Sequence, residues 1–236
     1  MKNLSFLKQN YIAHRGLHDE KNPENSMGAF KKALKKGYII ELDVHLLKDN
    51  TVVVFHDDNL YRMTHIKKQI KDYTYDELKK IKLLDSKYGI PKFEDVLKLV
   101  DGKVPIIVEL KYDLKAGLLE KEVVKFLDIY DGEFCVKSFS PFSVHWFKKN
   151  RPKYVRGLLI SARNKTVKQK FLHSRFVFWF CKPDFISCNY MISNKILSRF
   201  RAKIPVIAWT IRNDFVFSRY KNKFDNIIFE SIKIGK

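Results

Sequence analysis

The stretch IIELDVHLLKDNTVVVFHD, residues 39 to 57, contains two apolar runs, Ile39–Val44 and Val52–His56. Three residues, His45, Leu46 and Leu47, extend the first run beyond ELDV. Only Lys48, Asp49, Asn50 and Thr51 then separate it from VVVFH. A crossover between parallel strands needs a dozen or more residues, so this connection is too short for one. Asp-Asn is favourable turn chemistry. The stretch therefore predicts an antiparallel hairpin.

The rest of the chain alternates apolar runs with helix-like segments. The further runs are Tyr11–His14, Val104–Leu110, Phe134–Phe139, Val155–Ile160, Phe185–Cys188, Pro205–Thr210 and Asn226–Phe229. Helical spacing or helix starts occur at Ser26–Lys36, Tyr75–Lys82, Phe93–Val100, Lys115–Tyr130 and Phe142–Lys149. Such alternation implies βαβ units and a mostly parallel sheet. With the second hairpin arm set aside, eight strands remain, which is the number in an α/β barrel.

Length and composition fit one globular domain spanning residues 1–236. The chain is 45% hydrophobic and has no low-complexity tract or Pro/Gly linker. Its first ten residues lack the apolar run of a signal peptide, and no segment is long enough to span a membrane. Cys135, Cys181 and Cys188 have neither metal-binding nor redox spacing. They predict free thiols in a reducing compartment, and hence a cytoplasmic location.

Positive charge is concentrated in the second part of the chain. Residues 137 to 236 contain 22 Lys and Arg against four Asp and Glu, which is +18 of the total +20. Such a field attracts nucleic acid, anionic lipid or phosphate-bearing substrates, although a generally Lys-rich composition explains it equally well. No zinc finger, aromatic RNA-binding signature or recognition helix accompanies it, so no specific nucleic-acid partner is predicted.

Three carboxylates stand in apolar runs. Glu41 and Asp43 are two residues apart on one strand and so share a face. Glu109 ends the run Ile106–Leu110, and Lys111 lies two residues further on the same face. Oxygen ligands of this kind suit Mg²⁺ or Ca²⁺, and the lysine can hold a phosphate oxygen. The alternatives are solvated strand ends or ion pairs with Lys and Arg.

Two histidines, His14 and His56, also end apolar runs. If the hairpin turn is centred on Asp49-Asn50, His56 lies about opposite Asp43. Beside three carboxylates, two imidazoles suggest a general acid and a general base, because they titrate near neutral pH. A single such histidine is more often a hydrogen-bonded structural residue. The next residue, Arg15, can bind a phosphate with two hydrogen bonds.

The motifs resemble the glycerophosphodiester phosphodiesterase family. They occur in one order over nearly the whole chain. The matching segments are His14-Arg15-Gly16, Pro23-Glu24-Asn25-Ser26, Glu41-Leu42-Asp43-Val44, His56-Asp57, Leu60 to Thr64, Ile90 to Leu97, Val108-Glu109-Leu110-Lys111, Ser138-Phe139 and Ile207-Ala208-Trp209-Thr210. His-Arg-Gly alone would mean little, whereas the ordered set is highly specific.

The resemblance implies a TIM barrel with a small insertion after the second histidine, at about residues 57–88. It implies one divalent cation, Mg²⁺ or Ca²⁺, as cofactor and a small glycerophosphodiester as substrate. The implied metal ligands are Glu41, Asp43 and Glu109, the acid/base pair is His14 and His56, and the substrate-binding residues are Arg15, Lys111, Trp209 and Asn25.

The implied reaction is hydrolysis of the diester to an alcohol and sn-glycerol 3-phosphate. The nucleophile is either water or the neighbouring glycerol hydroxyl, and either histidine can be the acid. Two alternatives stay open: a lysophospholipase D-type activity on lipid at a membrane surface, and a catalytically inactive basic protein that binds anionic lipid or nucleic acid.

Two segments depart from the family pattern. Residues 224–231 (FDNIIFES) stand where the family typically reads Gly-Val-Asp-Gly-Ile-Ile-Thr-Asp, which puts the last loop and the head-group specificity in question. Lys165–Lys182 mixes basic and aromatic residues and matches no motif. It is either an interfacial segment on an anionic membrane or a barrel helix and loop whose aromatic side chains pack on the core.

Overall fold

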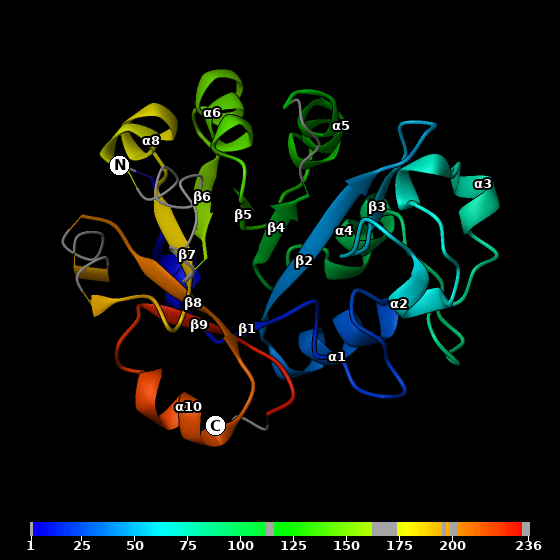
Figure 1. The fold of residues 1–236 in the computed structure, drawn as a ribbon, viewed down its shortest axis with the longest axis horizontal. Coiled ribbons are helices and arrows are strands. Elements are labelled where there is room, and N and C mark those ends of the chain that lie inside the picture. Colours follow the sequence, from blue (N-terminus) through cyan, green and yellow to red (C-terminus); the bar gives the residue numbers. More distant parts are fainter. Residues whose placement is uncertain (1, 112–115, 162–173, 195–196, 199–202, 233–236) are drawn as a thin grey trace.

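Eight of the nine predicted strands close into a parallel barrel in the computed structural model, which describes residues 2–111, 116–161, 174–194, 197–198 and 203–232. The barrel strands are β1 (Ile12–Ala13), β2 (Ile39–Leu46), β4 (Ile106–Leu110), β5 (Phe134–Ser138), β6 (Val155–Ile160), β7 (Phe185–Asn189), β8 (Val206–Ile211) and β9 (Asn226–Phe229). Each pairs in parallel with its neighbours, and β1 closes the ring by pairing with both β2 and β9. The predicted α/β barrel is confirmed (Figure 1).

The ninth strand, β3 (Val52–Val54), pairs with β2 in antiparallel fashion, as the short connection predicted. The predicted register was wrong by one residue: the Phe55 amide donates to the Asp43 carbonyl at 3.0 Å, so Phe55 and not His56 lies opposite Asp43. The cause is the turn, in which Leu47 pairs with Thr51 across a three-residue loop. Asn50 there adopts a left-handed conformation, with φ of 63°, as the third residue of such loops commonly does.

The larger described helices lie in connections between successive barrel strands and surround the barrel (Figure 1). They are α1 (Met27–Lys36), α4 (Phe93–Val100), α5 (Leu118–Leu127), α6 (Pro141–Asn150), α8 (Arg175–Cys181) and α10 (Asp214–Tyr220). Ser26 caps α1 by accepting a hydrogen bond from the Ala29 amide at 3.2 Å. The two-turn helix α10 was not predicted, because its seven residues are too few to show a clear helical period.

Residues 57–88 lie between β3 and α4 and form short pieces: α2 (Tyr61–Thr64), η2 (Ile70–Asp72) and α3 (Tyr75–Leu78). Another short 3₁₀ helix, η1 (Ser5–Lys8), precedes β1. The 57–88 segment shares an apolar cluster with the hairpin, separate from the barrel core. Its buried members are Leu47, Val53, Phe55, Leu60, Met63, Ile70, Leu78, Leu83 and Ile90. This cluster holds the segment against the extended end of β2 (Figure 1).

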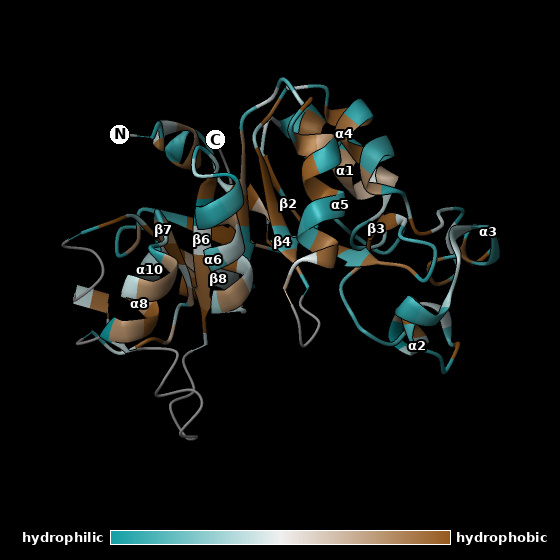
Figure 2. Cartoon of the chain, turned by 90° about the horizontal axis from the view of Figure 1, so that it is seen from above, coloured by the Kyte–Doolittle hydropathy of each residue, from teal (hydrophilic) through white to brown (hydrophobic). Residues whose placement is uncertain are grey.

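Side chains alternate along each barrel strand between the barrel interior and the helix layer. Ile40, Leu42 and Val44 of β2 belong to the large cluster under the helices, whereas Ile39 belongs to the smaller cluster inside the barrel. The strands are accordingly coloured hydrophobic in Figure 2, and the helices carry one hydrophobic and one hydrophilic side. Since Glu41 and Asp43 have the parity of Ile39, they point into the barrel.

The stretch Lys165–Lys182 is described only from Ser174 onward; its remaining residues lie outside the described ones. In that part, α8 buries Val177 and Cys181 against the barrel core. Phe176 and Trp179 are exposed. Among the described residues, no helix is long and apolar enough to cross a membrane.

Candidate active site

Strand register aligns the central charged residues at the carboxyl end of the barrel. Asp43 on β2 is paired with Glu109 on β4, which in turn is paired with Lys137 on β5. Because parallel strands keep equivalent residues on one level, the three side chains form a row across the barrel interior. His14 and Lys111 directly follow β1 and β4, at the same end. Active sites of such barrels lie at this end.

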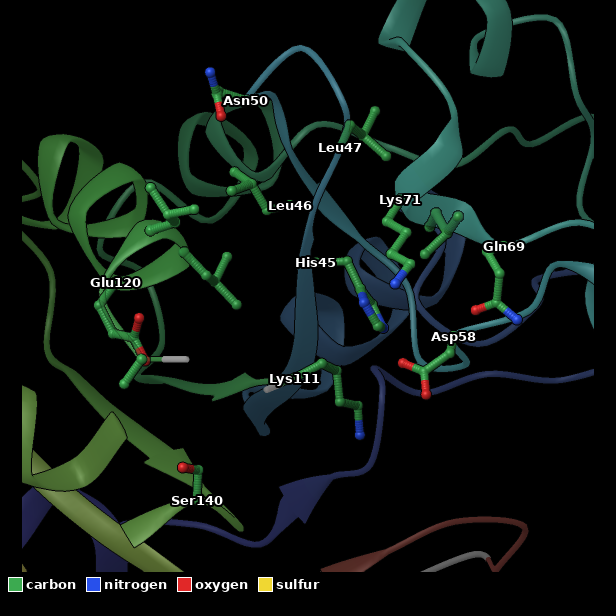
Figure 3. A pocket seen from close by; sticks show the side chains of 14 residues that line it. His45, Leu46, Leu47, Asn50, Asp58, Gln69, Lys71, Lys111, Glu120 and Ser140 are labelled. Carbon is green, nitrogen blue, oxygen red and sulfur yellow. The ribbon is translucent and has the colours of Figure 1, made fainter. Parts of the chain in front are cut away.

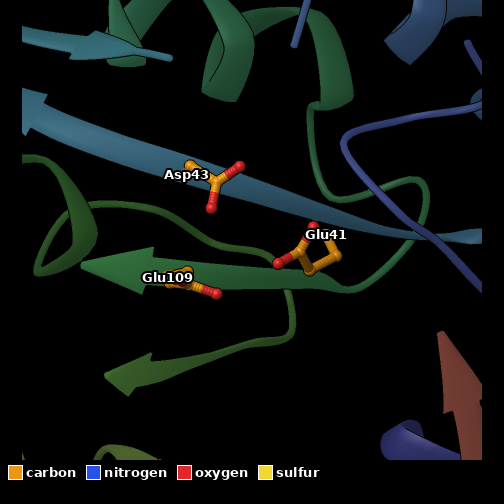
Figure 4. A group of neighbouring side chains, drawn as sticks. All are labelled: Glu41, Asp43 and Glu109. Carbon is orange, nitrogen blue, oxygen red and sulfur yellow. The ribbon is translucent and has the colours of Figure 1, made fainter. Parts of the chain in front are cut away.

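Glu41, Asp43 and Glu109 form a compact group of carboxylates (Figure 4). All three are buried, with exposed fractions of 0%, 1% and 5%. One carboxylate oxygen from each lies within 4.8 Å of the others. Three unbalanced negative charges at this depth would cost several kcal/mol each in desolvation, so the group needs cations beside it.

Two lysines supply part of that charge. Lys111 Nζ lies 2.8 Å from Asp43 Oδ1 and 2.5 Å from Glu109 Oε1. Lys137 Nζ lies 2.7 Å from Glu41 Oε1 and 3.2 Å from Glu109 Oε2. Lys137 was not among the predicted site residues, although a lysine inside the apolar run Phe134–Phe139 was a signal that could have found it.

The pKa values of these groups follow their mutual contacts. Burial raises the pKa of Asp43, but the ammonium of Lys111 and the guanidinium of Arg15 outweigh it and hold that pKa well below its usual range. The pKa of Glu109 is likewise lowered, against burial, by Lys111 and Lys137. The carboxylates raise the pKa of Lys111 and Lys137 although burial acts the other way. All four groups are therefore charged at neutral pH.

The oxygens of this group fit a divalent cation. Glu41 Oε1 and Asp43 Oδ1 are buried, and each faces one lysine ammonium, at 2.7 Å and 2.8 Å. A carboxylate has about four lone-pair sites on its two oxygens, so an ammonium contact leaves sites that a cation can use. Three carboxylates within one ion's reach are the hard oxygen donors that Mg²⁺ and Ca²⁺ prefer.

Arg15 and Asn25 reach the carboxylates through left-handed backbone conformations, each with φ of 55°. Arg15 donates its backbone amide to Glu41 at 3.0 Å, and its guanidinium contacts Glu24 at 2.6 Å and Asp43 at 3.3 Å. Asn25 donates its side-chain amide to Asp43 at 2.9 Å. The loop between β1 and α1 therefore orients the carboxylates from one side.

His14 is held by the last strand of the barrel. Its Nδ1 contacts Glu230 Oε2, just after β9. Arg212 contacts the other oxygen of Glu230, and His18 Nε2 lies 3.6 Å from Oε2. Despite burial, these histidines and Arg212 hold the pKa of Glu230 well below its usual range. Because a carboxylate only accepts hydrogen bonds, His14 carries its proton on Nδ1 and keeps Nε2 free to face the barrel mouth.

His56 has an equivalent partner. Its Nδ1 lies 2.5 Å from Asp57 Oδ1, and Asp57 in turn contacts Arg62 at 2.6 Å. These hydrogen bonds and charges lower the pKa of Asp57 against the effect of burial. His45 contacts the His56 carbonyl through Nε2 at 3.1 Å and fixes the backbone there. Both histidines thus have one ring nitrogen fixed by a carboxylate.

Five of the predicted site residues line a cavity of about 220 Å³: His14, Arg15, His56, Glu109 and Trp209. Trp209 closes one side and stacks edge-on against Phe139, with ring centroids 5.8 Å apart. The lining includes His14, Arg15, His56, Glu109, Lys137, Phe139, Tyr190, Met191, Trp209 and Arg212. Among the residues predicted for substrate binding, Arg15 and Trp209 line this cavity, whereas Asn25 and Lys111 do not. Asn25 donates a hydrogen bond to Asp43, and Lys111 lines a neighbouring cavity.

A second, larger cavity of about 620 Å³ borders the site at Lys111. Figure 3 shows Glu120 of α5 on one side of it and Asp58 of the 57–88 segment on the other. Its wall includes the aliphatic residues Leu46, Leu47, Ile70, Ala116, Leu118 and Leu119. The cavity thus combines an apolar wall with the ammonium that contacts the carboxylates.

The sequence as a whole matches one family model over residues 14–232, described as the glycerophosphoryl diester phosphodiesterase family. The chain belongs to this family. The prediction of an enzyme, a phosphoric diester hydrolase, is thereby confirmed. The family assignment agrees with the ordered motifs around His14, Asp43 and Glu109.

Individual relatives support the same assignment. The chain is 36% identical over 171 residues to a glycerophosphodiester phosphodiesterase of Caldanaerobacter subterraneus, covering 65% of this chain and 67% of the relative. It is 30% identical to the putative glycerophosphodiester phosphodiesterase YhdW of Bacillus subtilis, covering 86% of each. In fold it resembles an Oleispira antarctica phosphodiesterase in complex with the product sn-glycerol-3-phosphate, with a TM-score of 0.80 at 23% identity over 95% of this chain and 93% of that one.

Proposed function

We propose that this family member is a metal-dependent enzyme that hydrolyses glycerophosphodiesters to an alcohol and sn-glycerol 3-phosphate by acid–base catalysis with two histidines. The observation that carries the proposal is a single cavity lined by His14, His56 and Glu109, with Glu41 and Asp43 buried beside Glu109. The product named for the Oleispira antarctica neighbour is in keeping with this reaction.

Glu41, Asp43 and Glu109 are the residues that would hold the cation. A divalent ion bound there neutralises charge on the phosphodiester and so favours attack on phosphorus. Lys111 and Lys137 already balance part of the negative charge of the three carboxylates. The lysines lower the pKa of Asp43 and of Glu109, which favours the ionised form of those two carboxylates, the form that binds metal.

Arg15 and Lys111 bind the phosphate. Arg15 lines the cavity that contains the histidines, and Lys111 lies on its border. Asp43 contacts both cations and orients them. Charge-assisted hydrogen bonds from them fix the diester and stabilise the negative charge that grows on the phosphorane oxygens. Trp209 and Phe139 form the apolar wall against which the carbon skeleton of the glycerol or of the alcohol packs.

His14 and His56 divide the proton transfers between them. Glu230 and Asp57 each hold one Nδ1, so each imidazole presents Nε2 for catalysis. One Nε2 takes the proton from the nucleophile, which is water or the adjacent glycerol hydroxyl. The other imidazole, in its protonated form, gives a proton to the leaving alkoxide. In the hydroxyl route the first product is a cyclic phosphate, which water then opens.

A second candidate substrate is a lipid phosphodiester, cleaved in a lysophospholipase D-type reaction. The larger cavity beside Lys111 favours it, because its aliphatic wall is suited to an acyl chain while the phosphate lies near Lys111. The other alternative, a catalytically inactive basic protein, has less support. It leaves unexplained why both histidines are held by carboxylates at one cavity.

The decisive experiment measures glycerol 3-phosphate released from glycerophosphocholine by the wild type, His14→Ala and Glu41→Ala. Wild-type activity that disappears with chelator, returns with Mg²⁺ or Ca²⁺, and falls by about 10³-fold or more in each variant agrees with the proposal. The matched control is His65→Ala, an exposed histidine in the 57–88 segment. Activity that persists in either site variant contradicts the mechanism, and a lysophosphatidylcholine assay run in parallel distinguishes the lipid alternative.

A further inference from the structure

Exposed apolar side chains gather at one end of the barrel. In four of the helices, the first or second residue is a large apolar residue that is more than half exposed, and a fifth such residue follows β7 by two positions. The five, here termed the apolar rim, are Leu118 of α5, Phe142 of α6, Phe176 of α8, Met191 after β7 and Phe215 of α10.

The chain direction brings these residues to the active-site end. In a parallel barrel each helix begins where the preceding strand ends, so helix starts lie at the carboxyl ends of the strands. That is the end at which His14 and Lys111 follow their strands. Met191 connects the apolar rim with the site, since it is 63% exposed and also lines the cavity that contains both histidines.

The far end of the barrel lacks this pattern in the part of the chain that the structure describes. At that end, among the described residues, a single large apolar residue is exposed just after a barrel helix ends. It is Ile129, which follows α5 by two positions. Single exposed apolar side chains, scattered over a surface, need no explanation. Here one such side chain occurs after each of the five consecutive strands β4, β5, β6, β7 and β8, and this regular placement indicates an interaction surface.

The charge and the aromatic content of this end suit an anionic lipid surface. Arg175 is exposed next to Phe176, and Arg212 is 61% exposed beside the site. Trp179 is 65% exposed one turn further along α8, with its ring 6.1 Å from that of Phe176. Aromatic side chains with neighbouring arginines, on a chain of net charge +20, are the combination that binds the interface of anionic membranes.

We propose that the apolar rim docks this protein on a bilayer that contains anionic phospholipid, with the active-site cavity facing the membrane. Leu118, Phe142, Phe176, Met191 and Phe215 enter the headgroup region, and Arg175 contacts lipid phosphates. The proposal concerns where the protein binds and needs no turnover, so its test is independent of the proposed reaction.

The test is co-sedimentation of the full chain with phosphatidylcholine vesicles that contain or lack phosphatidylglycerol. The wild type binds the anionic vesicles at low ionic strength, and high salt weakens the binding. The double variant Phe142→Ser/Phe215→Ser loses about tenfold or more in vesicle affinity. The matched control, Ile129→Ser, makes the same kind of change at the opposite end and binds like the wild type.

A second pair of variants tests the charge. Arg175→Gln weakens binding, whereas Lys149→Gln, exposed at the far end of α6, has a smaller effect. The fluorescence of Trp179 provides an independent readout: its emission shifts to the blue with anionic vesicles, and the Trp179→Phe variant loses that shift. Circular dichroism of every variant checks that it is folded.

Three results overturn the proposal. One is no wild-type binding to anionic vesicles at low ionic strength. Another is equal binding by the Phe142→Ser/Phe215→Ser variant and the wild type, which would mean that charge alone brings the protein to the vesicles. The third is a wild-type dimer in solution that dissociates in this variant, because the apolar rim would then bind a second copy of the chain.

Discussion

Glu230 and His14 are neighbours across the closure of the barrel: the carboxylate that follows β9 accepts the Nδ1 proton of the histidine that follows β1. The two residues are 216 positions apart in the chain. Arg212, at the end of β8, contacts the other carboxylate oxygen and orients Glu230. Three consecutive strands of the sheet thus cooperate to orient one imidazole, and this relationship leads to the first prediction.

Replacing Glu230 by Gln lowers kcat and leaves KM nearly unchanged, because a neutral amide oxygen holds the His14 Nδ1 proton more weakly than the carboxylate does and no longer stabilises the imidazolium, while the phosphate contacts remain. We expect a loss of about 10- to 100-fold in kcat, as for other groups that orient a functional histidine. Steady-state kinetics with glycerophosphocholine measures it. Glu133→Gln, the same change at an exposed position near the start of β5, is the control. A wild-type kcat in Glu230→Gln would show that His14 does not depend on Glu230.

The proposed metal site predicts an effect of Lys137 on protein stability. Replacing Lys137 by Met leaves Glu41 and Glu109 without the ammonium between them, and breaking a buried ion pair typically costs about 3–5 kcal/mol. We expect a lower melting temperature in chelator and a larger stabilisation by Mg²⁺ or Ca²⁺ than in the wild type, because the cation takes over the missing charge.

Thermal denaturation followed by circular dichroism, with chelator and with each ion, measures this effect. Lys149→Met, at an exposed position of α6, is the control and changes neither value. Equal stabilisation of Lys137→Met and the wild type by the ions would contradict a cation site at these carboxylates.

Gly157 on β6 leaves room for Phe185 on β7 inside the barrel. A Cβ at Gly157 would lie 2.3 Å from the Phe185 ring, which is fully buried. Gly157→Ala therefore overpacks the interior, and we expect a loss of about 1–3 kcal/mol in the free energy of unfolding. Urea denaturation measures it. The double variant Gly157→Ala/Phe185→Leu should recover part of the loss, and no recovery would mean that the clash is not the cause.

The three thiols should resist modification in the folded protein. Cys135, Cys181 and Cys188 are buried, and burial raises the pKa of Cys181 and of Cys188 to about 12. At pH 8 Ellman's reagent should therefore react with none of them until urea unfolds the chain. Rapid reaction of any thiol in the native state would contradict the packing around β5, α8 or β7, which carry Cys135, Cys181 and Cys188.

The same pKa shifts predict the direction of a pH effect on stability. From about pH 9, the unfolded chain loses thiol protons that the folded chain keeps, so the folded state binds more protons. The free energy of unfolding should then fall as the pH rises from about 9 toward 12. In the variant Cys181→Ala/Cys188→Ala this fall should be shallower, as urea denaturation at several pH values will test.

Local patterns predicted the strands because each is a short apolar run between polar segments. The shortness of the connection at residues 48–51 was enough to separate the hairpin arm β3 from the eight barrel strands. The hairpin register was wrong by one residue because it depends on the backbone conformation of Asn50, which residue type alone does not determine.

The site divides in a similar way. Glu41, Asp43 and Glu109 were found from the sequence because a charge inside an apolar strand is costly unless it has a role. Lys137 was overlooked, since its partners become visible only when the register sets it beside Glu109. Glu230 stood out only as a departure from the family pattern until closure of the barrel placed it against His14.

By itself, the sequence determined the alternation of strands and helices, the hairpin, the family and the charged residues of the barrel interior. These features depend on local periodicity and on residue type. Only the tertiary structure decided which carboxylate holds which cation or histidine, and that the exposed residues of four helices and one loop lie at the same end of the barrel. Such relationships join residues far apart in the chain, and closing the barrel is the physical step that brings them together.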